Sequence, residues 1–95
     1  MEEKLVSKKV MVQLKVLPED IDTDLEELLK KIGSILPEDV GIYKYDILPV
    51  AFGLKVLKLT VIMPEDKEGG PDSTVEAIEK LDEVQRVEIG LMSLI

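Results

Sequence analysis

The heptapeptide Val10-Met11-Val12-Gln13-Leu14-Lys15-Val16 decides how this chain folds. Valine or leucine stands at every second position, with methionine, glutamine or lysine between them. Such strict alternation is typical of a β-strand that buries one face and exposes the other. A second stretch of this kind, Leu54 to Met63, repeats the pattern, with the side chains at 57, 59, 61 and 63 on one face. The sequence therefore predicts a sheet with one face packed against a core.

Two segments between the strands show helical periodicity. In the first, Thr23 and Glu26 match a capping box, and Pro37 predicts the end of the helix. Its apolar residues form one stripe at helical spacing: Leu25, Leu28, Leu29, Ile32, Ile35 and Leu36. In the second, Ser73 and Glu76 match another capping box. Its apolar residues are Val75, Ile78 and Leu81. Both segments are predicted to be amphipathic helices.

The remaining strands complete the order β-α-β-β-α-β. A strand from Gly41 to Leu48 is predicted less clearly, and the last strand alternates around Val87, Ile89 and Leu91. This order is that of the ferredoxin-like α+β sandwich, a four-stranded antiparallel sheet with two helices on one face. Because the chain is short and shows no linker, repeat or low-complexity segment, we expect one domain over residues 1–95.

The turn between the second and third predicted strands is unexpectedly apolar. Hairpin tips normally carry Asn, Asp, Gly or charged residues, yet Pro49 to Gly53 contains Val50, Ala51 and the only phenylalanine, Phe52. An exposed apolar patch indicates a partner surface. The alternative is that Phe52 folds back onto the core. The topology places this tip at one end of the sheet, and the carboxyl terminus with the loops 37–41 and 64–71 at the other.

Composition excludes several classes of function. The chain has neither cysteine nor histidine, which removes disulfides, thiolate metal sites and the commonest general base. Its serines therefore have no histidine to activate them, and its acidic clusters lack calcium-loop spacing. We expect a protein that is not an enzyme and that holds no metal or cofactor.

The net charge and the hydropathy of the chain limit the classes of partner that it is expected to bind. A net charge of −8 and only two tyrosines and one phenylalanine argue against direct nucleic-acid binding. The amino terminus lacks a signal-peptide pattern, and no apolar run approaches the length that spans a membrane. We therefore expect a cytoplasmic protein without a membrane partner, monomeric when free.

The segment Pro49-Val50-Ala51-Phe52-Gly53-Leu54-Lys55 resembles a segment of the archaeal translation elongation factor 1-beta family. The resemblance extends over nearly the whole chain and, more distantly, to the carboxyl-terminal exchange domain of the eukaryotic counterpart. Supporting segments are Lys15 to Glu19, Asp22 to Glu26, and Val61 to Met63 with the acidic loop that follows. The resemblance implies guanine-nucleotide exchange on elongation factor 1-alpha, the GTPase that delivers aminoacyl-tRNA to the ribosome, without covalent chemistry.

The same resemblance implies which residues meet the partner. Phe52 matches the family's aromatic tip residue, which contacts the second domain of the GTPase. Pro49 and Gly53 would then shape the turn, with Val50 and Ala51 packed around the ring. Lys55 matches a family lysine that would face an acidic patch, although it also fits an ordinary strand-edge lysine that protects against aggregation.

At the other end the chain departs from the family pattern. Eukaryotic relatives carry a lysine next to last, reaching toward the magnesium site of the GTPase, whereas this chain has Leu94 there, followed by Ile95. The role of that lysine therefore cannot be assigned to Leu94. The residues that could, by their location, weaken the binding of Mg²⁺ and of the nucleotide phosphates to the GTPase are Leu94, Ile95, Lys67 and Lys4. The alternative for Leu94 and Ile95 is that they only finish a strand.

A second class of function also fits the fold. Small-molecule-binding regulatory domains use the same βαββαβ plan and bind ligands at dimer interfaces through glycine-bearing loops. Gly33, Gly41 and the Gly69-Gly70 pair are the only hints of such loops, and they form no recognisable motif.

Overall fold

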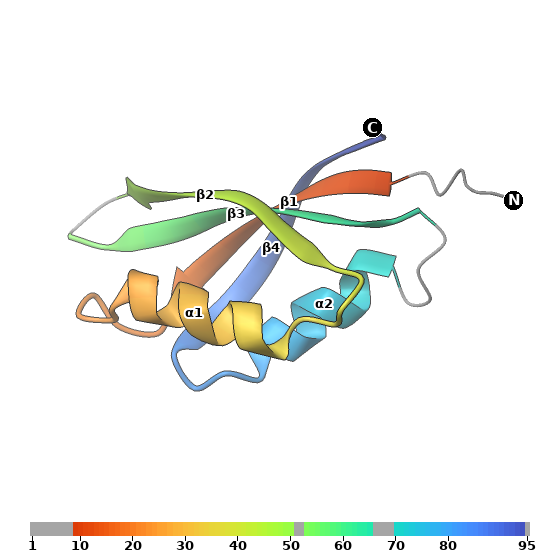
Figure 1. The fold of residues 1–95 in the computed structure, drawn as a ribbon. Helices are drawn as coiled ribbons and strands as arrows, with labels where there is room; N and C mark the ends of the chain where they lie inside the picture. Colours follow the sequence, from red (N-terminus) through yellow and green to blue (C-terminus); the bar gives the residue numbers. More distant parts are fainter. Residues whose placement is uncertain (1–8, 51–52, 66–69, 95) are drawn as a thin grey trace, which may run out of the picture.

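A computed structural model describes residues 9–50, 53–65 and 70–94 of the chain. Its elements are β1 (Lys9–Pro18), α1 (Leu25–Ile35), β2 (Gly41–Pro49), β3 (Lys55–Pro64), α2 (Gly70–Glu79) and β4 (Val84–Leu94). The four strands form one antiparallel sheet in the order β2-β3-β1-β4. Both helices lie on one face of this sheet (Figure 1). The predicted ferredoxin-like α+β sandwich is confirmed.

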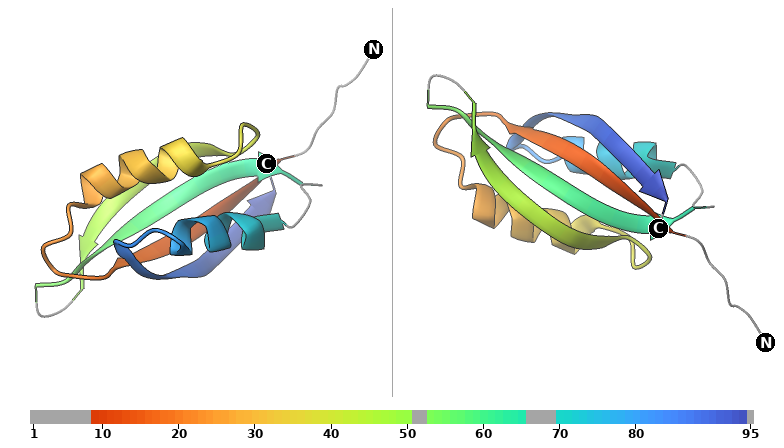
Figure 2. Two further views of the ribbon diagram at one scale, coloured as in Figure 1. Left: turned by 90° about the horizontal axis from the view of Figure 1, so that it is seen from below. Right: turned by 90° about the horizontal axis from the view of Figure 1, so that it is seen from above.

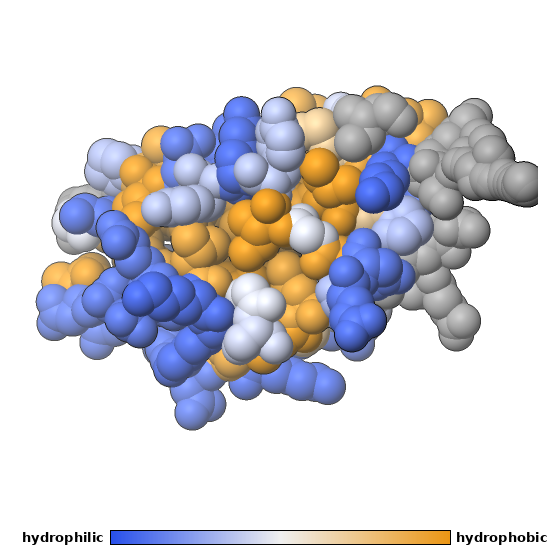
Figure 3. All heavy atoms as spheres, in the orientation of Figure 1, coloured by the Kyte–Doolittle hydropathy of each residue, from blue (hydrophilic) through white to orange (hydrophobic). Residues whose placement is uncertain are grey.

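The apolar core lies between the sheet and the helices. The alternating residues of the two central strands are buried as predicted: Val12, Leu14, Val16, Leu57, Leu59, Val61 and Met63. The helices meet them with Leu25, Leu28, Ile32 and Ile78. In side view, apolar residues gather between the two layers, while hydrophilic residues lie over α1 (Figure 3). Removal of this apolar surface from water is the main source of stability.

The start of α1 differs from the prediction by one residue. Asp24, not Thr23, is the N-cap, and its Oδ1 accepts hydrogen bonds from the amides of Glu26 at 3.1 Å and Glu27 at 3.2 Å. The capping box predicted at Thr23 is therefore wrong. Aspartate is among the strongest N-cap residues, and its negative charge also favours the positive end of the helix dipole.

The start of α2 is also earlier than predicted. The helix begins at Gly70, so Ser73 lies inside its first turn. The Ser73 hydroxyl donates to the carbonyl of Gly70 at 3.3 Å instead of accepting from the helix amides. The capping box predicted at Ser73 is wrong, because the helix already includes this residue.

Thr74 in α2 carries a buried hydroxyl without a hydrogen-bond partner among the described residues. Because an unpaired buried hydroxyl loses its bonds to water, replacing Thr74 with the isosteric valine is expected to raise the free energy of unfolding by about 1 kcal/mol. Urea denaturation measures this change. Ser73→Ala is the control, since it removes an exposed hydroxyl that has a partner. A Thr74→Val variant no more stable than wild type would contradict the prediction.

β2 contains a register shift that explains its weak pattern. Ile42 pairs with Val61 and Lys44 pairs with Thr60, which leaves Tyr43 as an extra residue. Ile42 and Ile47 consequently both pack against the core, although strict alternation would put them on opposite faces.

Strand pairing fixes what lies at each end of the sheet. Pro49 pairs with Lys55 at one end, called here the tip end. At the other, the terminal end, Pro64 and Leu94 pair with Lys9 and Val10 at the start of β1. The prediction that the hairpin and the carboxyl terminus lie at opposite ends is confirmed (Figure 2). A ten-residue strand separates them by about 30 Å.

Candidate partner-binding surfaces

The hairpin at the tip end has a defined closing geometry. The amide of Val50 donates to the carbonyl of Leu54 at 2.9 Å, just beyond the last strand pair, Pro49 with Lys55. Gly53 has a φ of +79°, in the left-handed region that favours glycine. The predicted turn-shaping role of Gly53 thus agrees with its backbone.

The described part of the hairpin is apolar and exposed. Val50 is 52% exposed, and Leu48 beside it is also exposed. Lys55 is exposed next to the turn. The predicted contact residues Ala51 and Phe52 lie outside the described residues. An exposed valine and leucine beside them agree with the partner surface predicted from the sequence.

Gly53→Ala is expected to lower the free energy of unfolding by about 1 kcal/mol, because alanine is strained at this positive φ. Gly41→Ala is the matched control. Gly41 lies in β2, has no positive φ, and a Cβ there would meet nothing within 4 Å. Thermal unfolding of both variants measures the difference, and equal melting temperatures would contradict the assignment of strain to Gly53.

Polar contacts hold the tip end together behind the hairpin. The amide of Glu19 donates to the carbonyl of Glu83 at 2.8 Å, which joins the loop after β1 to the loop before β4. Lys31 of α1 donates to the carboxylate of Glu83. This bond, assisted by a backbone hydrogen bond, lowers the pKa of Glu83 below its ordinary 4.5. The same bond to Glu83 raises the pKa of Lys31 above 10.5.

The ion pair predicts a pH window of stability. The Glu83 contribution is complete above pH 4.5 and is lost as the pH falls through its lowered folded pKa. The Lys31 contribution is complete below pH 10.5 and is lost as the pH rises through its raised folded pKa. We expect Glu83→Gln to lower the melting temperature slightly at neutral pH, and the difference to vanish in acid. Glu76→Gln, on exposed α2 surface, is the control. A difference that persists at low pH would contradict the ion-pair account.

At the terminal end the strand β4 is exposed beyond its first residues. Val84 and Val87 are buried, and Glu79 of α2 accepts a hydrogen bond from the Val87 amide at 3.0 Å. From Glu88 onward every described residue of β4 is exposed, including Leu94. Ile95 lies outside the described residues, as do Lys4 and Lys67. Leu94 does complete a strand, as the alternative interpretation predicts, and it is exposed there.

The structure adds exposed apolar residues that the sequence analysis did not assign to a partner surface. Ile21, in the loop between β1 and α1, is 61% exposed at the tip end. Leu91 and Met92 are exposed near the terminal end, Leu91 by 70%. Ile21 carries a sequence signal, since it is the only apolar residue between Pro18 and Leu25. In the sequence, Leu91 continues the alternation of Val87 and Ile89, which gives no sign of exposure; in the structure a register shift puts Met92, not Leu91, opposite Val12, and Leu91 is exposed.

These features agree with a protein-binding domain. Exposed apolar residues occur at both ends of the sheet. Within the ranges 9–50, 53–65 and 70–94, no group of three side chains is arranged to hold a metal ion. The helices described there are too short or too polar to cross a membrane.

Comparison with known proteins gives the family. Residues 11–95 match the model of the EF-1 guanine nucleotide exchange domain, and the chain belongs to this family. It is 52% identical to Elongation factor 1-beta of Staphylothermus marinus, over 85% of this chain and 90% of the relative. It is 45% identical to Elongation factor 1-beta of Archaeoglobus fulgidus, over 90% of this chain and 97% of the relative. The archaeal exchange-factor family predicted from the hairpin segment is confirmed.

A solved structure supports the fold alone. The C-terminal domain of the MgtC protein from Mycobacterium tuberculosis superposes with a TM-score of 0.55 at 14% identity. The match covers 93% of this chain and 90% of that domain. At so low an identity the likeness says nothing about function.

Proposed function

We propose that this chain binds the GTPase elongation factor 1-alpha and promotes GDP release and GTP loading during protein synthesis in the cytoplasm. The observation that carries the proposal is the match of residues 11–95 to the exchange domain of this factor family. The exposed hairpin at the tip end supports it, because Val50 and Leu48 offer the apolar surface that a protein partner would bury.

The action needs binding energy but no covalent step. An exchange factor binds the nucleotide-free GTPase more tightly than the GDP-bound form, and by linkage it lowers the affinity for GDP by the same factor. The composition agrees with such a role, since the chain has no histidine or cysteine for acid-base or nucleophilic chemistry.

The two ends of the sheet would contact different parts of the GTPase. At the tip end, Phe52 is the proposed anchor, with Val50 and Ala51 around it and Lys55 facing an acidic patch. Pro49 and Gly53 hold the turn that presents them. At the terminal end, Leu94 and Ile95 would approach the nucleotide-binding domain, where an inserted apolar strand end displaces the phosphate loop sterically and no penultimate lysine is required.

Titration calorimetry with two forms of the GTPase tests this proposal. We expect binding to the nucleotide-free form to be at least about tenfold tighter than binding to the GDP-loaded form, a coupling of about 1.4 kcal/mol. Excess GDP should dissociate the complex. Equal affinity for both forms would overturn the proposal. Light scattering of the free protein at the same concentrations tests the expected monomer.

A further inference from the structure

The sheet has one face without helices, called here the open face. It carries the side chains of each strand that point away from the core, and it is the face turned toward the viewer on the right of Figure 2. Strand register assigns to it Lys9 and Lys15 of β1, Lys44 and Asp46 of β2, Lys58 of β3, and Arg86 and Glu88 of β4.

The charge of the open face is opposite to that of the whole protein. Five basic residues against two acidic ones give it a local net charge of +3, in a chain whose net charge is −8. The acidic residues therefore concentrate on the helices and the loops. In α1 and the loop before it, for example, only Lys30 and Lys31 are basic, against six acidic residues: Glu19, Asp20, Asp22, Asp24, Glu26 and Glu27.

At the centre of the open face two lysines stand directly opposite each other. Lys15 of β1 pairs in register with Lys58 of β3, so that two like charges lie directly opposite each other across neighbouring strands. Asp46 and Glu88 flank them on the outer strands. Neither lysine makes an ion pair within the described part of the chain, whereas Glu88 pairs with Arg86 at 2.8 Å.

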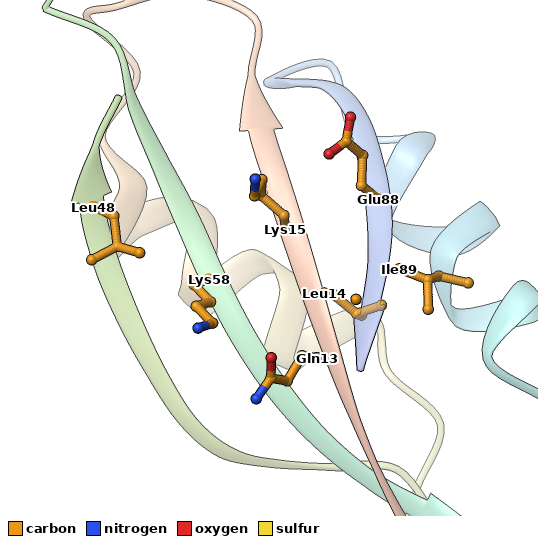
Figure 4. A pocket seen from close by; sticks show the side chains of 8 residues that line it. Gln13, Leu14, Lys15, Leu48, Lys58, Glu88 and Ile89 are labelled. Atoms are coloured by element: carbon orange, nitrogen blue, oxygen red, sulfur yellow. The ribbon is translucent and has the colours of Figure 1, made fainter. Parts of the chain in front are cut away.

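The two lysines line a shallow pocket. It has a volume of about 430 Å³, and Gln13, Leu48 and Glu88 also line it, so that all four strands contribute (Figure 4). A Cβ at Gly90 would lie 3.3 Å from the carbonyl oxygen of Gln13, so the glycine keeps this part of the pocket open. The pocket combines cationic, anionic, amide and apolar groups in one concave surface.

Apolar groups extend the open face toward the tip end. Val56 of β3, on the tip side of Lys58, belongs to this face and is only 2% exposed, although neither described helix lies on this face. Leu48 pairs with Val56 and is exposed at the edge. The open face thus has apolar groups beside its lysines, as protein-binding surfaces commonly do.

We propose that the open face docks on an acidic surface of the partner GTPase, with partner carboxylates held by Lys15 and Lys58. This inference rests on the proposed function. A partner that contacts both ends of the sheet also extends along the domain between them. The helix face presents mainly carboxylates, whereas on the open face Lys15 and Lys58 make no ion pair with any described residue. Charge complementarity therefore selects an acidic partner surface and the open face.

Neutralising variants test the inference. The test pair is Lys15→Gln with Lys58→Gln, and the matched control is Lys30→Gln with Lys80→Gln, two exposed lysines on the helices' side that give the same net charge. Release of fluorescent GDP from elongation factor 1-alpha is measured at sub-saturating concentrations and low salt. We expect the test pair to slow exchange about tenfold and to flatten its salt dependence, and the control pair to stay within about twofold of wild type.

A charge-preserving pair guards against a folding artefact. Lys15→Arg with Lys58→Arg should exchange like wild type, and circular dichroism should show all variants folded. Equal rates for the test and control pairs, with active wild type, would overturn the inference but leave the proposed function intact. Wild type without activity would overturn both. Binding of tRNA that the test pair abolishes, with exchange unchanged, would assign the open face to RNA and overturn the protein-docking proposal.

Discussion

Replacing Phe52 with alanine is expected to lower the exchange efficiency on elongation factor 1-alpha about 30-fold. Aromatic anchors at the centre of an interface typically contribute 2 kcal/mol or more, and a change of about 2 kcal/mol corresponds to this factor. The hairpin supports such an anchor, because Val50 and Leu48 are exposed and Gly53 adopts the turn conformation that glycine favours. The rate of fluorescent GDP release at sub-saturating concentration measures the loss.

Ile21→Ala is the matched control for Phe52→Ala. Ile21 is an exposed apolar residue at the same end of the sheet but outside the hairpin. We expect it to change exchange less than about threefold, since isolated exposed apolar residues at a rim contribute little. Wild-type exchange by Phe52→Ala at limiting concentration would contradict the assignment of the tip as an anchor.

Leu59→Ala is expected to cost about 3 kcal/mol of the free energy of unfolding. Leu59 is fully buried in the central strand β3, between Leu14 of β1 and Tyr45 of β2. Its removal leaves a cavity where sheet and helices meet. Leu91→Ala is the control, because it removes the same atoms from a side chain that is 70% exposed. Urea denaturation with similar losses for both variants would contradict the placement of the core.

The fold was predictable where burial follows a simple period. Val12 and Leu14 alternate with longer or polar side chains because one face of β1 packs on the helices and the other does not. The same reasoning fails in β2, where the register shift at Tyr43 puts Ile42 and Ile47 on one side. Such a bulge depends on tertiary packing and leaves no periodic signal in the sequence.

Helix boundaries were predicted less accurately than helix existence. Thr23 and Asp24 are neighbouring residues that can both cap a helix, and the sequence does not decide between them. Similarly, Ser73 and Glu76 have the spacing of a capping box, yet Gly70 already begins α2. The apolar stripe predicts the buried side of each helix, because it repeats over several turns.

The two candidate surfaces also differ in whether the sequence alone predicts them. The apolar hairpin tip was visible in the sequence because its residues are consecutive. The opposed lysines of the open face were not, since Lys15 and Lys58 are far apart in the chain and meet only through the pairing of β1 with β3. A surface whose residues come together through strand pairing can be recognised only after the strand order and register are known.

The most direct test of exchange activity is the release of a fluorescent GDP analogue from elongation factor 1-alpha of the same source. The chain is added at one molecule per many GTPase molecules, with excess unlabelled nucleotide. We predict accelerated and complete release, because a factor that binds and departs serves each GTPase in turn. Release at the spontaneous rate, from a GTPase shown to be active, would contradict the account.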